Sequence, residues 1–158
     1  MNSQLTKEQA LQKVKYYCAY QERCHSEVKE KLYSLGLHKK DAEELLSNLI
    51  EENYLNEERF AIQFAGGRFR IKQWGKVKIK YELKQKQVSD YCIKKALASI
   101  NENDYQKTIQ KLFSAKLSTL KSEKNSFVKK KKIQDYLLQK GFVASIINEL
   151  LSEQIQKK

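Results

Sequence analysis

The sequence predicts an all-α fold, in which three tandem three-helix repeats form an elongated, curved, right-handed array. Two observations carry this prediction. Proline is absent and glycine occurs only 5 times in 158 residues, so the punctuation typical of β-rich folds is missing. Apolar residues recur at the helical spacing i, i+3, i+4 and i+7, and the whole pattern is written three times along the chain.

The repeated pattern combines an apolar helix face with an upstream apolar pair at i, i+4. Measured from the first copy, both features return after 51 residues and again after 105. The faces are Ala42, Leu45, Leu46 and Leu49; Ile93, Ala96, Leu97 and Ile100; and Ile147, Leu150 and Leu151, with Gln154 breaking the last. The pairs are Val28 and Leu32, Ile79 and Leu83, and Ile133 and Leu137. Such a period predicts repeats at residues 1–56, 57–104 and 105–158.

Capping residues predict the helices of the first repeat. Thr6 and Gln9 form a capping-box pattern that opens the first helix. Ser26 is predicted to cap a second helix, and Gly36 stands where a left-handed turn would end it. A third helix is predicted over about residues 39–53.

The later repeats reuse these signals with one exception. Asn56 is predicted to cap the first helix of the second repeat, and Gly75 separates that helix from the next. Gly141 repeats the role of Gly36 in the third repeat. Gln87 occupies that place in the second repeat, so its turn must close without glycine's tolerance of positive φ.

Gly66 and Gly67 lie inside an otherwise helical run, at a cost of about 1 kcal/mol each relative to alanine. We interpret the pair as a sign of close packing or of a bend. A hinge for docking is the alternative.

The charge is unevenly distributed along the chain. The formal net charge is +12, yet residues 1–56 hold 8 basic and 9 acidic side chains, and residues 57–158 hold the other 23 basic and 10 acidic ones. This asymmetry favours a polyanionic partner for the later two-thirds, whereas general solubility is the alternative explanation. The N-terminal residues lack the apolar core of a signal peptide and no apolar stretch reaches membrane-spanning length, so we expect a cytoplasmic protein with no membrane contact.

The sequence offers no marked catalytic or metal-binding set, and we expect neither an enzyme nor a cofactor. Three cysteines suit a reducing compartment, and Cys18 and Cys92 are interpreted as small core residues. Cys24 and His25 are adjacent and therefore poorly placed to act together as nucleophile and base. His38 has no carboxylate pair at a useful spacing.

Two basic segments are the candidate binding residues. The first contains Arg68, Arg70, Lys72, Lys76, Lys78, Lys80, Lys84 and Lys86; the second contains Lys129, Lys130, Lys131 and Lys132. In the first segment, Lys76, Lys80 and Lys84 repeat every four residues and are predicted to form a stripe that follows phosphates or an acidic groove. The second segment is more typical of a solvated helix face.

Aromatic residues lie between the cations of the first segment. Trp74, Phe69 and Tyr81 are candidates for stacking on unpaired bases, and burial of Phe69 and Tyr81 in the core is the alternative.

The central segment resembles the RecX family. The matching residues are Glu58, Arg59, Phe60 and Ala61; Trp74 and Gly75; and Lys78, Ile79, Lys80, Glu82 and Leu83. The first repeat resembles the family through Ser26-Glu27 and the Leu35-Gly36-Leu37 turn, and the third through Gln139 to Phe142. The departures are Lys76 where proline is usual, Gln87 where glycine is usual, Gly66-Gly67 where Arg-Ser is common, and lysine for arginine at 78 and 80.

The resemblance implies a regulator of the recombinase RecA, active in DNA repair, homologous recombination and the SOS response. Proteins of that family bind along the groove of the RecA filament on single-stranded DNA, and restrain its ATP hydrolysis, strand exchange and co-protease action. We expect a monomer whose partner is the RecA filament, with direct contact to single-stranded DNA left open. A general single-stranded nucleic-acid-binding module, a helix-turn-helix transcription factor and a scaffold without a nucleic-acid partner are the alternatives.

Overall fold

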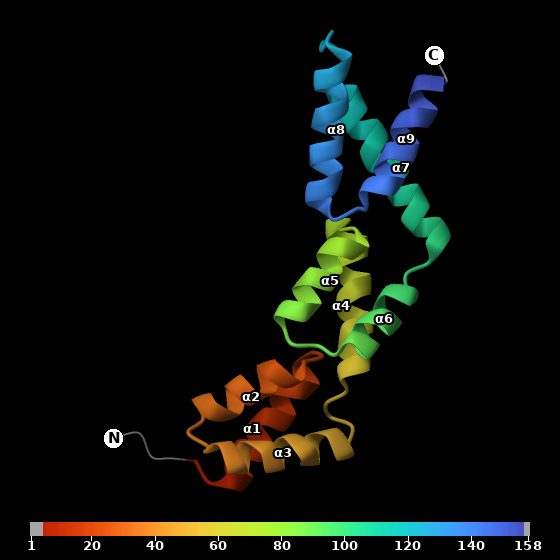
Figure 1. The fold of residues 1–158 in the computed structure, drawn as a ribbon. Helices are drawn as coiled ribbons and strands as arrows, with labels where there is room; N and C mark the ends of the chain where they lie inside the picture. The colour runs from red at the N-terminus through yellow and green to blue at the C-terminus, as the bar shows by residue number, and fades with distance from the viewer. Residues whose placement is uncertain (1–4, 157–158) are drawn as a thin grey trace. The chain divides into compact units, whose positions relative to one another are not determined.

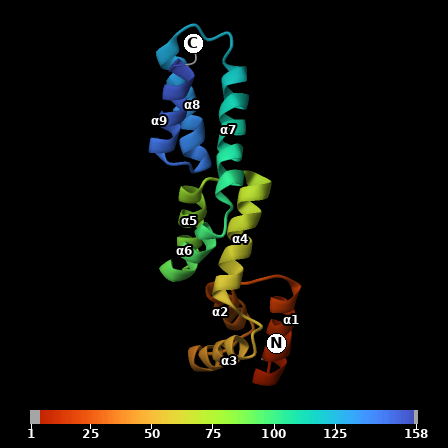
Figure 2. The same cartoon turned by 90° about the vertical axis from the view of Figure 1, so that its right-hand side faces the viewer.

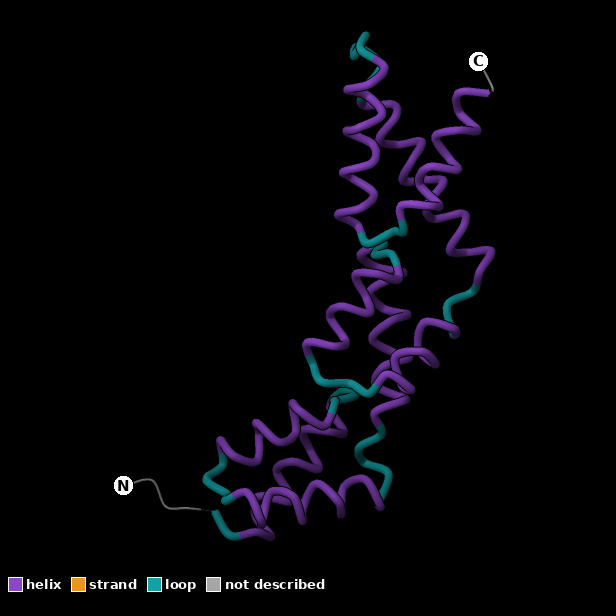
Figure 3. The backbone as a smooth tube through the Cα atoms, in the orientation of Figure 1, coloured by secondary structure: helices purple, strands orange, loops and turns teal. Residues whose placement is uncertain are grey.

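The computed structural model describes residues 5–156, which form nine helices joined by loops, without strands (Figure 1, Figure 3). The helices are α1 (Lys7–Tyr20), α2 (His25–Ser34), α3 (Lys39–Glu51), α4 (Glu57–Lys72), α5 (Lys76–Gln85), α6 (Asp90–Ala98), α7 (Glu102–Thr119), α8 (Ser126–Lys140) and α9 (Ala144–Gln156). The all-α prediction is confirmed. Each helix in this part of the chain is too short or too polar to cross a bilayer.

The helices pack as two compact units. The first contains the described part of Met1–Phe64 together with Leu83–Ala96, and the second contains Ala65–Glu82 together with the described part of Leu97–Lys158. Helices α4, α5 and α6 therefore each contribute residues to both units. The division into three repeats at 1–56, 57–104 and 105–158 stays a prediction from the periodicity.

The first unit has a continuous apolar core in which α1, α2 and α3 pack against one another (Figure 1). Its buried residues are Ala10, Val14, Cys18, Val28, Leu32, Ala42, Leu45, Leu46, Leu49 and Leu55. The faces predicted from the helical spacing in the first repeat are thus the faces that pack.

Capping in the first unit follows the sequence at one helix and departs from it at the next. The Thr6–Gln9 capping box is present, which confirms that prediction. The Ser26 cap is wrong, because α2 begins at His25 and its N-cap is Cys24, whose backbone N–H donates to Glu27 Oε1 at 3.1 Å. The Ser26 hydroxyl donates instead to the Lys86 carbonyl at 2.7 Å.

The left-handed turns fall where the repeat predicts them. Gly36 and Gly141 have φ values of 91° and 101°. Gln87 has φ of 64°, so the second turn does close without glycine, at a strain of about 1–2 kcal/mol. Cys92 departs from its predicted core position and is half-buried, because the adjacent Ile93 takes the inward position on α6.

Arg59 links three segments of the first unit. Its Nε lies 2.5 Å from Glu22 Oε1, and its two terminal nitrogens donate to Asn53 Oδ1 and to the Asn53 carbonyl, each at 3.2 Å. Its backbone N–H donates to Asn56 Oδ1 at 2.9 Å, which confirms Asn56 as the cap of α4. The arginine of the central motif therefore holds the bend after α1 and the loop after α3 against the start of α4.

The second unit contains a chain of buried aromatic rings. The Tyr105 ring centroid lies 5.7 Å from that of Phe69 on α4 and 5.4 Å from that of Phe142, which follows α8. Helix α8 packs against both α7 and α9 (Figure 2). The rings thus connect α4 and α7 to the turn between α8 and α9.

Two glycines bring backbone segments of the second unit into direct contact. Gly75 N donates to the Lys140 carbonyl at 2.7 Å, and Val77 N donates to the Gly141 carbonyl at 2.9 Å. A Cβ placed on Gly75 would lie 2.4 Å from the Gly141 carbonyl carbon and oxygen. The start of α5 therefore accepts no side chain at position 75.

Gly66 and Gly67 lie within the uninterrupted helix α4. A Cβ on Gly66 would lie 2.8 Å from the Arg70 guanidinium, whereas a Cβ on Gly67 would meet nothing within 4 Å. Close packing thus applies to Gly66 alone, and only against a movable side chain.

Replacing Gly75 with alanine is expected to lower the free energy of unfolding of the second unit by about 1–3 kcal/mol, because the new methyl group overlaps backbone that cannot rotate away. Urea unfolding followed by circular dichroism and by the fluorescence of Trp74, the chain's single tryptophan, measures it. A Gly75→Ala protein as stable as the wild type would contradict the close contact.

Replacing Gly67 with alanine is expected to have the opposite effect and raise the free energy of unfolding by up to about 1 kcal/mol. The position is helical and open, so alanine gains helix propensity without a clash. The same urea titration measures it, and a loss of stability would show that position 67 requires glycine.

Candidate functional site

The second unit carries a group of cations around one indole ring, here called the Trp74 cluster: Arg68, Lys72, Trp74 and Lys78. Lys78 Nζ lies 4.7 Å from the Trp74 ring centroid, Lys72 Nζ lies 5.3 Å from it, and Arg68 Cζ lies 5.7 Å from it. These distances are within the range of cation–π attraction. All four residues belong to the basic segment that the sequence singles out.

A sharp turn between α4 and α5 builds the Trp74 cluster. Gln73 takes a left-handed φ of 57°, and Trp74 N donates back to the Arg68 carbonyl at 3.3 Å. Lys140 Nζ donates to the Lys72 carbonyl at 2.9 Å and so satisfies an acceptor at the end of α4. The turn folds the indole back over the last turns of α4, while Lys78 approaches it from α5.

The electrostatics of the Trp74 cluster favour an anionic ligand. Three like charges surround one ring, and within residues 5–156 neither Lys72 nor Lys78 forms an ion pair with a carboxylate. The indole face attracts the charges of Lys72 and Lys78 but does not neutralise them. A phosphate or carboxylate group beside these two lysines would do so.

The predicted stripe of Lys76, Lys80 and Lys84 is only partly available. Lys76 Nζ lies 3.6 Å from Glu102 Oε2 and 4.8 Å from the Tyr105 ring centroid, so its charge is used inside the second unit. Its backbone N–H donates to the Tyr105 hydroxyl at 2.9 Å. Lys80 and Lys84 are exposed, and they retain their place as candidates.

Two other cations of the first segment differ in their surroundings. Arg70 is exposed on α4, with its guanidinium above Gly66. Lys86 is half-buried in the first unit, where its Nζ lies 5.9 Å from the Phe64 ring centroid. Arg70 is therefore open to a ligand, whereas Lys86 packs against the protein.

The stacking candidates separate clearly. Phe69 is buried between α4 and Tyr105, so it is a core residue. Tyr81 is 60% exposed, and Trp74 is half-buried within its cluster. Of these three candidates, Trp74 and Tyr81 remain accessible to a base.

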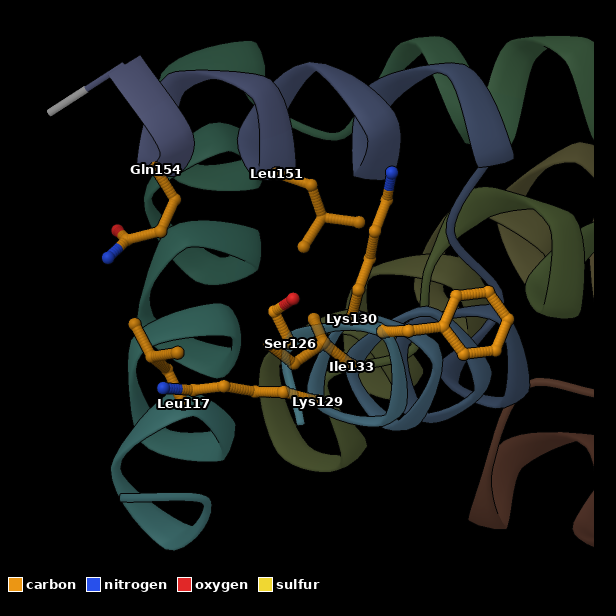
Figure 4. A pocket seen from close by; sticks show the side chains of 8 residues that line it. Leu117, Ser126, Lys129, Lys130, Ile133, Leu151 and Gln154 are labelled. Atoms are coloured by element: carbon orange, nitrogen blue, oxygen red, sulfur yellow. The ribbon is translucent and has the colours of Figure 1, made fainter. Parts of the chain in front are cut away.

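The lysines of the second segment divide between ion pairs and a cavity. Lys131 pairs with Asp135 and Lys132 pairs with Glu123, each at 3.7 Å. Lys129 and Lys130 line a largely apolar cavity of about 360 Å³, in which side chains from α7, α8 and α9 face one another (Figure 4). Its apolar wall includes Leu117, Phe127, Ile133 and Leu151, and Gln154, the residue that breaks the third apolar face, also lines it.

Cys24 and His25, the side chains with the chemistry of a nucleophile and a base, each contact a glutamate of the first unit. Burial raises the pKa of the Cys24 thiol, whose Sγ donates to Glu27 Oε1 at 3.1 Å. His25 Nδ1 lies 3.8 Å from Glu57 Oε2. In the described part of the chain, no three histidine, cysteine, aspartate or glutamate residues gather as a metal site.

Sequence reasoning missed Tyr105 and Lys140, which position the site without belonging to the basic segments. Tyr105 supplies the acceptor for the first N–H of α5, a group that a proline at position 76 would lack. The sequence did contain one indication. Lysine stands at position 76 where the family usually has proline, and its backbone N–H, which proline lacks, needs an acceptor.

Together, the helical fold and the Trp74 cluster define a helical protein with a cationic surface suited to polyanions. Residues 56–97 match the second three-helix domain of RecX, and residues 102–151 match the third. The regulatory protein RecX of Prosthecochloris aestuarii is 31% identical over 146 residues, which cover 91% of this chain and 92% of that protein. The chain belongs to the RecX family of regulatory proteins.

Other relatives agree in sequence and in fold. The regulatory protein RecX of Bacillus cytotoxicus is 28% identical over 90% of this chain, which spans only 52% of that longer protein. The crystal structure of RecX from Lactobacillus salivarius superposes with a TM-score of 0.83 at 26% identity, covering 93% of this chain and 95% of that one. The family resemblance in the central motif is thereby confirmed.

Replacing Tyr105 with phenylalanine is expected to lower the free energy of unfolding by about 1 kcal/mol, because the Lys76 N–H loses its acceptor while the ring packing is kept. Urea unfolding measures the change. Tyr81→Phe, which removes an exposed hydroxyl from α5, is the matched control and should be neutral. Equal stability of the two variants would contradict the role of the Tyr105 hydroxyl.

Proposed function

We propose that this protein binds in the groove of the RecA filament on single-stranded DNA and restrains RecA ATP hydrolysis, strand exchange and co-protease action. Membership of the RecX family supports the regulatory role. The Trp74 cluster is the observation that supports the proposed binding surface. The Nζ atoms of Lys72 and Lys78 lie within 5.3 Å of the Trp74 ring centroid, and neither lysine pairs with a carboxylate in residues 5–156.

The proposed binding surface extends from this cluster to Arg70 and Lys80, exposed cations of the second unit. Lys84, exposed in the first unit, is a separate candidate contact. Lysine heads act as point charges that attract phosphates or carboxylates without fixing one geometry. Binding is therefore expected to weaken steeply as salt is raised. Lys129 and Lys130 are a second candidate contact of the same kind, beside an apolar cavity.

We further propose that regulation proceeds by binding and not by catalysis. The buried Cys24 thiol, with its raised pKa, is a poor nucleophile at neutral pH. His25 is directed to Glu57, and its neighbour Cys24 donates to Glu27, so the two do not form a nucleophile–base pair. No cofactor enters this proposal.

The second candidate is a general single-stranded nucleic-acid-binding module. The accessible rings of Trp74 and Tyr81 among lysines favour it, because aromatic side chains stack on unpaired bases of any sequence. Affinity for bare and for RecA-coated single strands separates the two functions. The proposed function requires tighter binding to the coated strand.

Adding the protein to RecA on single-stranded DNA is expected to inhibit ATP hydrolysis, and Lys78→Glu with Lys80→Glu is expected to weaken that inhibition at least about tenfold. The two substitutions place negative charge where the ligand's negative charge would lie. The measurement is the protein concentration that gives half-maximal inhibition at low salt, with helicity checked by circular dichroism.

The matched control is Lys39→Glu with Lys40→Glu, which makes the same change in net charge on exposed residues of α3. It should inhibit like the wild type. Equal losses in both double variants would mean that net charge alone drives binding. No inhibition by the wild type in severalfold excess would refute the proposed function itself.

A further inference from the structure

A groove lined by tyrosines and cations lies between α1 and α2 in the first unit. Its volume is about 670 Å³, and its lining includes Lys13, Tyr16, Tyr17, Tyr20, Arg23 and Lys31. Among the described residues, none of those that line it carries a carboxylate. Three cations thus lie together in residues 1–56, a part of the chain whose net charge is slightly negative. Counting charges along the sequence does not predict this local group of cations.

Two of the tyrosines present their rings to solvent. Tyr16 is 76% exposed and Tyr20 is 75% exposed. They are four residues apart on α1 and share one face, while Val14 and Cys18 turn inward to the core. Core packing therefore does not account for these two large rings.

The third tyrosine contacts two of the groove's three cations. Tyr17 packs partly against the core, and Arg23 Cζ lies 3.8 Å from its ring centroid. Arg23 Nε also donates to the Tyr17 carbonyl at 3.2 Å, and Lys31 Nζ lies 5.5 Å from the same ring. Arg23 and Lys31 are thus oriented before any ligand arrives, which reduces the entropy that binding must overcome.

Glu27, whose charge acts on Tyr17, already accepts hydrogen bonds at the start of α2. Glu27 accepts hydrogen bonds from the Cys24 backbone N–H and from its thiol at the start of α2, each at 3.1 Å. Its carboxylate caps α2 and is not among the residues that line the groove.

We propose that this groove is a binding site for single-stranded nucleic acid, with unpaired bases stacked on Tyr16 and Tyr20 and the adjoining phosphates held by Lys13, Arg23 and Lys31. Cations beside exposed rings are the arrangement that such ligands require, because every base offers a π face and every nucleotide a phosphate. An acidic peptide would use the cations but leave both tyrosine rings in water. The proposal concerns the first unit and does not depend on RecA binding.

The test measures the affinity of the full chain for two fluorescent oligonucleotides of equal length, one of thymidines and one of abasic sites. Both carry the same phosphates, so their difference isolates base stacking. The wild type is expected to bind the thymidine strand at least about fivefold more tightly. Tyr16→Ala with Tyr20→Ala is expected to abolish that preference, and Tyr16→Phe with Tyr20→Phe to keep it, because both substituted side chains are exposed and the phenyl ring still stacks.

Tyr91→Ala is the matched control, since Tyr91 is 63% exposed on α6 and Lys95 Nζ lies 5.6 Å from its ring centroid. It should bind like the wild type. Photo-crosslinking with a 5-iodouracil strand, followed by mass spectrometry, should place the strand on Tyr16 or Tyr20. Equal affinity for the two strands, crosslinks confined to Trp74 and Tyr81, or displacement of the strand by poly-glutamate at equal charge concentration would each overturn the proposal.

Discussion

The contact between Gly75 and Gly141 is the constraint on which the second unit depends. Helix α5 starts with its N–H groups directed at the end of α8, where the Lys140 and Gly141 carbonyls accept two of them, and the Tyr105 hydroxyl accepts the one between. The backbone N–H groups at the start of α5 and the backbone carbonyls at the end of α8 would otherwise lack partners, and here they form hydrogen bonds with each other. The arrangement needs backbone to touch backbone, which only glycine permits at 75 and 141.

The Trp74 cluster follows from the same contact. Lys140, one residue before Gly141, donates to the Lys72 carbonyl and fixes the end of α4 opposite the start of α5. That fixed turn carries Trp74 and brings Arg68, Lys72 and Lys78 within 5.7 Å of its ring centroid. The charged surface is therefore a consequence of how two helix ends are joined.

The two units present cations in different ways. In the second unit, lysines surround a single partly buried indole, and in the first unit, an arginine and two lysines lie beside exposed tyrosines. Two covalently joined units that each contact one long polyanion bind it more tightly than either alone, because the second contact forms at a high effective concentration.

The sequence by itself determined the helices, most of their inward faces and the left-handed turns at Gly36, Gln87 and Gly141, because helical periodicity and turn signals are local properties of the chain. It found the cations of the Trp74 cluster, yet it placed Lys76 in the stripe and left both Phe69 and Tyr81 undecided between stacking and the core. Tertiary structure decided those cases. Lys76 turns to Glu102 and Tyr105, residues well beyond it in sequence, and Phe69 packs on Tyr105. The groove lined by tyrosines could not be predicted for the same reason. Its side chains come together only when α1 packs against α2, and the average charge along the chain does not show which side chains become neighbours.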